Sequence, residues 1–215
     1  RSEEVVEAAK AGLARVNEQQ QLAKDLLQTS LRPVLLNLAD HRKLTVPLLK
    51  GLSRLLELLA NCFNITLGEK LLEHLAKWKD PIKTQSWSAK EATEIAAEII
   101  DIFHRLPAAA EKFLEKLVTL TIGLESMLPG EVSSPYRVPL TRFLNRYSAA
   151  SVSFFLERIN QKPYCTLFQF VLREESAGPL REELHVQSSK LVSATFARAS
   201  TNPELSFEGV VIVKT

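Results

Sequence analysis

Residues 47–63, PLLKGLSRLLELLANCF, decide the fold. Pro47 is tolerated in the first turn of a helix, and Thr45 stands where a capping residue is expected. We expect one face of this helix to be buried, because its apolar residues recur at steps of three or four: Leu48, Leu52, Leu55, Leu56, Leu59 and Phe63. Leu49 and Leu58 widen this apolar face past half of the helix circumference, so the helix must contact neighbours on two sides.

The same spacing recurs along most of the chain, with prolines marking many of the boundaries. It predicts about ten helices with short connections, because a period near 3.6 residues is typical of amphipathic helices. Ser88 opens one of them, with Glu91 three residues later in capping-box spacing. The expected helices cover 3–28 (one or two helices), 31–38, 47–63, 67–75, 88–106, 107–124, 140–147, 152–159, 164–172 and 180–191.

The arrangement of these helices indicates an all-α fold, an α-solenoid of HEAT-like antiparallel helix pairs. Each pair spans about 35 to 45 residues, which is the period of such repeats. Periodicity alone leaves one closed helical bundle as the alternative. We expect a single segment, residues 1–215, with leading helices over 1–30, helix-pair repeats over 31–200 and an extended tail over 201–215. The tail contains the strand-like FEGVVIV.

Composition excludes several classes of protein. Hydrophobic residues make up 46% of the chain, which is typical of a folded protein, and only 7 residues are glycine. The 27 Lys and Arg residues against 25 Asp and Glu give a net charge of +2, too small an excess to indicate a nucleic-acid or membrane-surface binder. No apolar run reaches the roughly 18 residues of a membrane span.

We interpret Cys62 and Cys165 as free thiols in a reducing, intracellular compartment. Since the chain starts at Arg1, we interpret it as an internal piece of a longer protein.

No catalytic, metal or cofactor site is expected. None of the four histidines has another His or Cys within four residues, so zinc-ligand spacing is missing. Phosphate-binding glycine motifs and GxSxG are missing as well. Asp101 and His104 have the spacing of a base and its orienting carboxylate, but we favour a histidine that merely ends a helix. We therefore predict a protein that is not an enzyme and uses no cofactor.

A short basic segment is the first candidate for partner binding. Arg142 and Arg146 lie four residues apart on one helix face, Arg137 comes about one turn earlier, and Tyr136 and a second tyrosine are interleaved. Guanidinium groups bind carboxylates and phosphates through paired hydrogen bonds, so this segment could hold an acidic peptide. The structural alternative, which we favour, is ion pairing with the acidic segment 84–130 or with a neighbouring repeat.

Trp78 and Trp87 are the second candidate. They flank Pro81 in a connection between two expected helices. An exposed tryptophan can anchor a partner protein. Packing of the connection against the solenoid is the alternative, and we favour it.

Long sequence words carry a resemblance to a known family. The stretch 31–74 resembles the TRRAP family of transcription co-activator scaffolds, relatives of the phosphatidylinositol-3-kinase-like kinases. The resemblance covers residues 31–147, and it rests on these words: LRP (31–33), NLADHRKLTVP (37–47), RLLELL (54–59), IFHRLP (102–107), SPYR (134–137) and LNRY (144–147).

This resemblance implies an internal HEAT-repeat segment, distant from a C-terminal kinase-like domain that lacks catalytic residues in this family. It implies a nuclear scaffold that docks transcription activators and holds histone acetyltransferase complexes such as SAGA together. The implied partners are activators, other complex subunits and neighbouring repeats of the same chain, with no small-molecule substrate, no membrane and no direct nucleic acid. The alternatives are a nucleic-acid-binding helical repeat and a scaffold segment of another phosphatidylinositol-3-kinase-like protein.

Overall fold

The fold is helical throughout the part of the chain that the structure describes. The computed structural model describes residues 40–59, 66–79, 89–106, 108–129 and 133–196, with isolated helical positions between residues 4 and 15 and at Leu38. Within these ranges no strand occurs, which confirms the all-α prediction. Most of the expected leading helices, the helix expected over 31–38 apart from Leu38, and the expected tail over 201–215 lie outside the described residues.

Apart from the helix expected over 180–191, the described helices follow the expected order, with the 3₁₀ helices η3 and η4 inside the helices expected over 88–106 and 107–124. Three short 3₁₀ helices are η1 (His41–Lys43), η3 (Phe103–Arg105) and η4 (Ala108–Phe113). The α-helices are α3 (Val46–Leu59), α4 (Thr66–Lys77), α6 (Ala89–Ile102), α7 (Leu114–Glu125), α8 (Arg137–Arg146), α9 (Ser148–Glu157), α10 (Lys162–Arg173), α11 (Gly178–Val186) and α12 (Ser188–Phe196).

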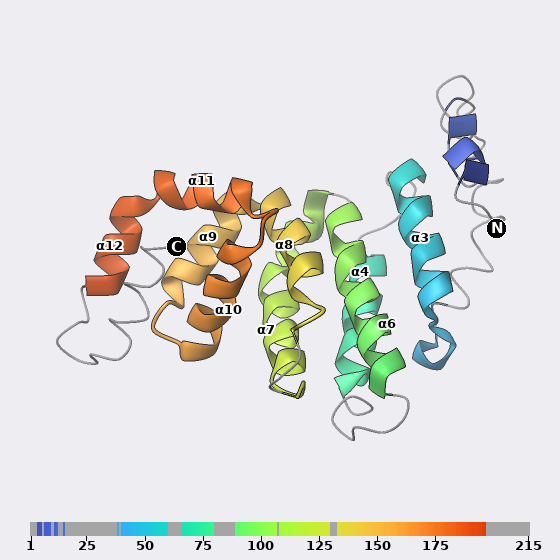
Figure 1. Ribbon diagram of the computed structural model, residues 1–215, viewed down its shortest axis with the longest axis horizontal. Coiled ribbons are helices and arrows are strands. Elements are labelled where there is room, and N and C mark those ends of the chain that lie inside the picture. The colour runs from blue at the N-terminus through green and yellow to red at the C-terminus, as the bar shows by residue number, and fades with distance from the viewer. Residues whose placement is uncertain are drawn as a thin grey trace.

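One expected helix, over 180–191, is wrong, because the structure divides it into α11 and α12. The break is at Gln187, whose backbone N–H ends α11 on the Glu183 carbonyl at 3.0 Å. The Gln187 side chain donates to the Ala149 carbonyl at 3.4 Å and accepts from the Ser153 hydroxyl at 3.1 Å, and both residues belong to α9. Figure 1 shows α11 lying across the top while α12 turns downward, so both helices reach α9.

The helices form two rows. The first row consists of α3, α6, α8 and α11, each in contact with the next, and the second row consists of α4, α7 and α10. Up to α8, consecutive helices alternate between the rows, as a solenoid of helix pairs requires. In Figure 1, α3 and α12 lie toward opposite ends of an elongated molecule, which excludes a closed bundle.

The leucine-rich helix α3 faces the core as its spacing predicts. Leu52 and Leu56 are buried, Leu49 is buried as well, and Leu55 is only partly buried. The buried face is therefore centred slightly closer to Leu49 than we expected, and the Leu59 side chain lies outside the described set. The predicted cap is confirmed, since the Thr45 hydroxyl accepts a hydrogen bond from the Leu48 backbone N–H at 3.4 Å.

Within the second row, Gly68 of α4 allows a close approach to Phe113. A Cβ atom added at Gly68 would lie 2.3 Å from Cε2 of Phe113 and 3.0 Å from Cδ1 of Leu106. Carbon atoms in contact normally lie about 3.5 to 4.0 Å apart. Only glycine therefore fits against the Phe113 ring, where η4 leads into α7.

Candidate partner-binding surface

A carboxylate on the last turn of α6 organises the first row. Asp101 accepts a hydrogen bond from Nη1 of Arg142 on Oδ1, at 2.6 Å, and one from Nη1 of Arg105 on Oδ2, at 2.9 Å. Arg105 also contacts Oε1 of Glu57 through Nη2, at 2.8 Å. We call these four residues the Asp101 cluster. They link α3, α6, η3 and α8 in one chain of ion pairs.

The local sequence explains half of this cluster. Asp101 and Arg105 are four residues apart, so they lie on the same side where α6 continues into η3. Glu57 and Arg142 come from other helices, 48 residues from Arg105 and 41 from Asp101. Asp101 keeps only 15% of its side chain exposed, whereas Arg142 keeps 49%. Arg142 is thus the part of the cluster that solvent reaches most.

His104 is an accessory to this cluster. Its Nδ1 lies 3.6 Å from Oδ1 of Asp101, an oxygen that already accepts the Arg142 hydrogen bond. Burial lowers the pKa of His104 below its usual value, although the Asp101 carboxylate opposes this shift. Both Asp101 oxygens accept hydrogen bonds from guanidinium groups, whereas Nδ1 of His104 is buried without a hydrogen-bond partner, so the arginines and not the histidine hold the carboxylate.

The predicted Arg146 caps a helix end in the neighbouring repeat. Its Nη1 donates to the His104 carbonyl at 2.7 Å and to the Leu106 carbonyl, both at the end of η3. These carbonyls have no partner within their own helix, and a cation there complements the negative end of the helix dipole. Arg181 of α11 does the same for α10, since its Nη1 donates to the carbonyls of Leu172 and Glu174.

The predicted Arg137 and Tyr136 are engaged inside the fold. Nε of Arg137 donates to Oε1 of Glu125 at 3.0 Å, and its guanidinium carbon lies 3.6 Å from the centroid of the Phe170 ring. Arg137 thereby joins α8 to α7 and α10 through an ion pair and a cation–π contact. Tyr136 is fully buried, on the same face as Leu140, and burial raises the pKa of its hydroxyl. Tyr136 therefore belongs to the core and offers no surface for a partner.

The two tryptophans have different outcomes. Trp78, at the end of α4, is partly buried and packs against the core, and its ring meets the His41 ring edge-on at 6.3 Å. This contact agrees with the packing alternative for Trp78. Trp87 lies outside the described residues, so its role as an anchor stays a prediction.

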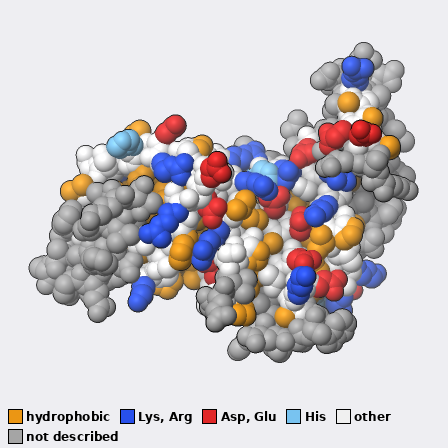
Figure 2. Space-filling view, in the orientation of Figure 1, with side chains coloured by type: hydrophobic (Ala, Val, Ile, Leu, Met, Phe, Trp, Pro, Cys, Tyr) orange, Lys and Arg blue, Asp and Glu red, His pale blue; other side chains and the backbone are white. Residues whose placement is uncertain are grey.

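The three arginines share one helix but not one function. Arg137, Arg142 and Arg146 all have partners within the chain, as the structural alternative required. On the face shown in Figure 2, positive and negative side chains are interspersed across the middle of the molecule. The sequence did not reveal Glu57 or Phe170 as partners, because each is brought in from another helix.

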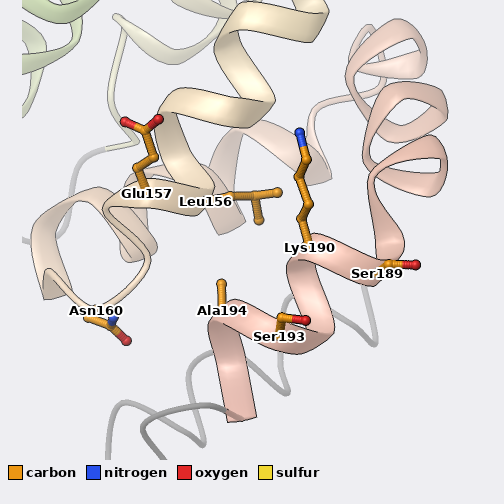
Figure 3. A pocket seen from close by; sticks show the side chains of 7 residues that line it. All are labelled: Leu156, Glu157, Asn160, Ser189, Lys190, Ser193 and Ala194. Carbon is orange, nitrogen blue, oxygen red and sulfur yellow. The ribbon is translucent and has the colours of Figure 1, made fainter.

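A hollow between α9 and α12 has a different character. Figure 3 shows Leu156 and Ala194 directed toward it, while the hydroxyl of Ser189 points away. Glu157, on its rim, pairs with Arg158 at 3.2 Å.

Among the described residues, no group of three or more His, Cys, Asp or Glu side chains is placed to hold a metal ion. In the same ranges, none of the helices combines the length and the apolar character that crossing a membrane requires.

Comparison with known proteins identifies the family. Over residues 1–215 the sequence matches the family described as the Tra1 HEAT repeat ring region. It is 48% identical over 189 residues to the probable transcription-associated protein 1 of Dictyostelium discoideum, covering 86% of this chain and 4% of that protein.

Two further relatives carry names that describe their assemblies or roles. The chain is 38% identical over 182 residues to the SAGA complex/NuA4 acetyltransferase complex subunit TRA1 of Saccharomyces cerevisiae, covering 82% of this chain and 5% of that protein. It is 25% identical over 214 residues to the human transformation/transcription domain-associated protein, covering 88% of this chain and 6% of that protein. The chain thus spans only a small part of each relative. With its two rows of helices and its match along the whole length, the chain belongs to the Tra1 HEAT repeat ring family.

Proposed function

We propose that this chain is a non-catalytic scaffold segment of a large transcription co-activator subunit, which assembles a histone acetyltransferase complex and recruits transcription activators. The observation that carries the proposal is the match of residues 1–215 to the ring region of a family with members named as SAGA and NuA4 subunits. Its place of action is the nucleus, and its partners are activators, other subunits of the complex and neighbouring repeats of the parent chain.

The geometry supports a scaffold that keeps its shape. In a solenoid each repeat contacts only its neighbours, so long faces stay available to partners. The Asp101 cluster ties three helices of the first row together, and Arg146 adds hydrogen bonds to the backbone of the preceding repeat. A row held in this way presents binding residues at fixed distances from one another.

We place an activator contact on α8, at Arg142 and Arg146. Arg142 is about half exposed, so an acidic segment can approach its guanidinium group alongside Asp101. Electrostatic complementarity of this kind mainly accelerates association. Trp87 stays a proposed apolar anchor. The nucleic-acid alternative has less support, because the whole chain carries a net charge of only +2.

The assembly function can be tested in the full-length subunit. Replacing both Leu52 and Leu56 with aspartate puts charges into the α3 core, which should unfold this segment. We expect acetyltransferase subunits to be lost from the purified complex, as quantified by mass spectrometry. Lys90→Glu, at an exposed position on α6, is the control and should retain them. Normal recovery of every subunit with the double variant at wild-type abundance would refute the proposal.

The activator contact needs two measurements on one variant. Arg142→Glu with Arg146→Glu should weaken binding of an acidic activation segment by about 1 kcal/mol or more for each charge-assisted hydrogen bond that the substitutions remove. The same variant should melt at a lower temperature, because Asp101 loses the Arg142 donor and keeps only Arg105, and the carbonyls at the end of η3 lose the Arg146 donor. A lower melting temperature with unchanged activator affinity would show that these arginines serve the fold alone.

A further inference from the structure

A groove on the second row runs between α4 and α7 and has an apolar floor. Its volume is about 710 Å³, and its floor contains Leu72, Phe113 and Leu120. Leu72 and Phe113 are buried, whereas Leu120 is partly exposed. The groove is separate from the Asp101 cluster, which lies on the first row.

The two walls of the groove carry opposite charges in matching spacing. Glu69 and Glu73, four residues apart, form the wall on α4, and both are exposed. Lys112 and Lys116, also four residues apart, form the wall at the junction of η4 and α7. Glu115 also lines this wall, and its carboxylate is paired with Nη2 of Arg158 at 3.2 Å, which leaves the two lysines as the charges that give the wall its sign. A spacing of four places each pair along one side of its helix. An acidic edge therefore faces a basic edge across an apolar floor.

The groove is bridged by an ion pair at one end. Nζ of Lys112 lies 2.9 Å from Oε1 of Glu69. Toward the other end, Glu73 pairs with Lys70 of its own helix at 2.8 Å. Among the described side chains no ion pair joins Glu73 to Lys116, so the two walls are not bridged at this end of the groove.

We propose that this groove binds an amphipathic α-helix of a protein partner, with a basic edge against Glu69 and Glu73 and an acidic edge against Lys112 and Lys116. Helices bind in grooves through apolar residues at i, i+3, i+4 and i+7, and charged residues at i and i+4 follow the same side. The opposed walls therefore fix which edge of the helix faces which wall. A nucleic acid would be repelled by the acidic wall, as would an acidic segment without basic residues. This inference rests on the proposed scaffold function and adds the chemistry of one partner.

The test uses the full-length subunit in its purified complex. A photo-crosslinking amino acid replaces Ala76, which is exposed and lines the groove, or Glu94, an exposed control position on α6. We expect Ala76 to crosslink to one helical segment with an apolar stripe between a basic and an acidic edge, and Glu94 not to do so. Lys116→Glu should lower the crosslinking yield about tenfold, the effect of removing one charge-assisted hydrogen bond.

Matched variants make the result decisive. Lys116→Ala, which removes the charge without reversing it, should lower the yield less than Lys116→Glu, and Lys90→Glu on α6 should leave it unchanged. The inference is overturned if Ala76 gives no more crosslinking than Glu94, if the crosslinked segment lacks the two charged edges, or if Lys116→Glu leaves the yield unchanged. In each of these outcomes the groove proposal fails, but the scaffold function is unaffected as long as the complex retains its subunits. Absence of the acetyltransferase subunits from the wild-type complex would contradict the scaffold function itself.

Discussion

Replacing Gly68 with alanine should destabilise the protein, although alanine is the better helix former. The added Cβ would lie 2.3 Å from Cε2 and 2.9 Å from Cζ of Phe113. The ring cannot retreat easily, because it is buried and packs edge-on against Phe103 at a centroid distance of 5.8 Å. Overpacking of a core costs about 1 to 3 kcal/mol, and this overlap exceeds 1 Å, so we take the upper value. Helix propensity returns about 1 kcal/mol, which leaves a net destabilisation of about 2 kcal/mol.

The matched control is the glycine of α3. An alanine Cβ at Gly51 would have no atom within 4 Å, so Gly51→Ala should stabilise the protein by up to about 1 kcal/mol. At about 2 to 4 °C per kcal/mol for a chain of this size, Gly68→Ala should lower the melting temperature by about 4 to 8 °C, while Gly51→Ala should raise it. Thermal unfolding followed by circular dichroism at 222 nm measures both. Equal melting temperatures for the two variants would refute the close approach of α4 to Phe113.

Three further predictions concern buried side chains. Leu52→Ala should cost about 2 to 5 kcal/mol in urea unfolding, and Leu55→Ala clearly less, because only Leu52 is fully buried; the reverse order would contradict the orientation of α3. His74 is fully buried and burial lowers its pKa, so the unfolded chain binds a proton more readily than the folded chain does. The free energy of unfolding should therefore fall as the pH drops below about 6.5, and it should fall less in His74→Asn. Urea unfolding of both proteins at pH 7.5 and 5.5 measures the difference. Cys165 is buried, so its side chain should resist alkylation until the protein is unfolded, and rapid labelling of the folded protein would contradict its burial.

Elements with strong local signals could be predicted from the sequence. The dense leucines of α3 and the Thr45 cap act within a few residues, so spacing alone locates that helix and its start. The break between α11 and α12 could not be predicted, since it contains neither glycine nor proline. At this break Gln187 accepts a hydrogen bond from Ser153 and donates one to the Ala149 carbonyl, and these α9 residues lie 34 and 38 positions earlier in the chain. Such contacts exist only once the helices have packed.

The candidate surface shows the same limit. The sequence placed Arg137, Arg142 and Arg146 on one helix, and it named ion pairing within the chain as an alternative. It could not choose the partners, because Asp101 is brought to Arg142 from 41 residues away by the packing of α6 on α8. Tyr136 was offered as a surface residue because it is interleaved with arginines. Its position at the start of α8, four residues before the buried Leu140, turns it inward.

The arginine caps at helix ends have a consequence for how this chain can change over generations. Arg146 and Arg181 bond to backbone carbonyls, so the side chains of His104, Leu106, Leu172 and Glu174 are not what they recognise. Packing still constrains the buried Leu106 and Leu172, but a substitution at any of the four positions leaves the link between repeats in place, provided that the backbone keeps its course. The arginines have less latitude. Arg181 also donates from Nη2 to the Glu175 carbonyl at 3.3 Å, and lysine lacks the planar fork of donors needed for such a contact. Side chains at the capped helix end can therefore change while the contact with the neighbouring repeat is kept. In each contact, selection for the link acts mainly on the one arginine.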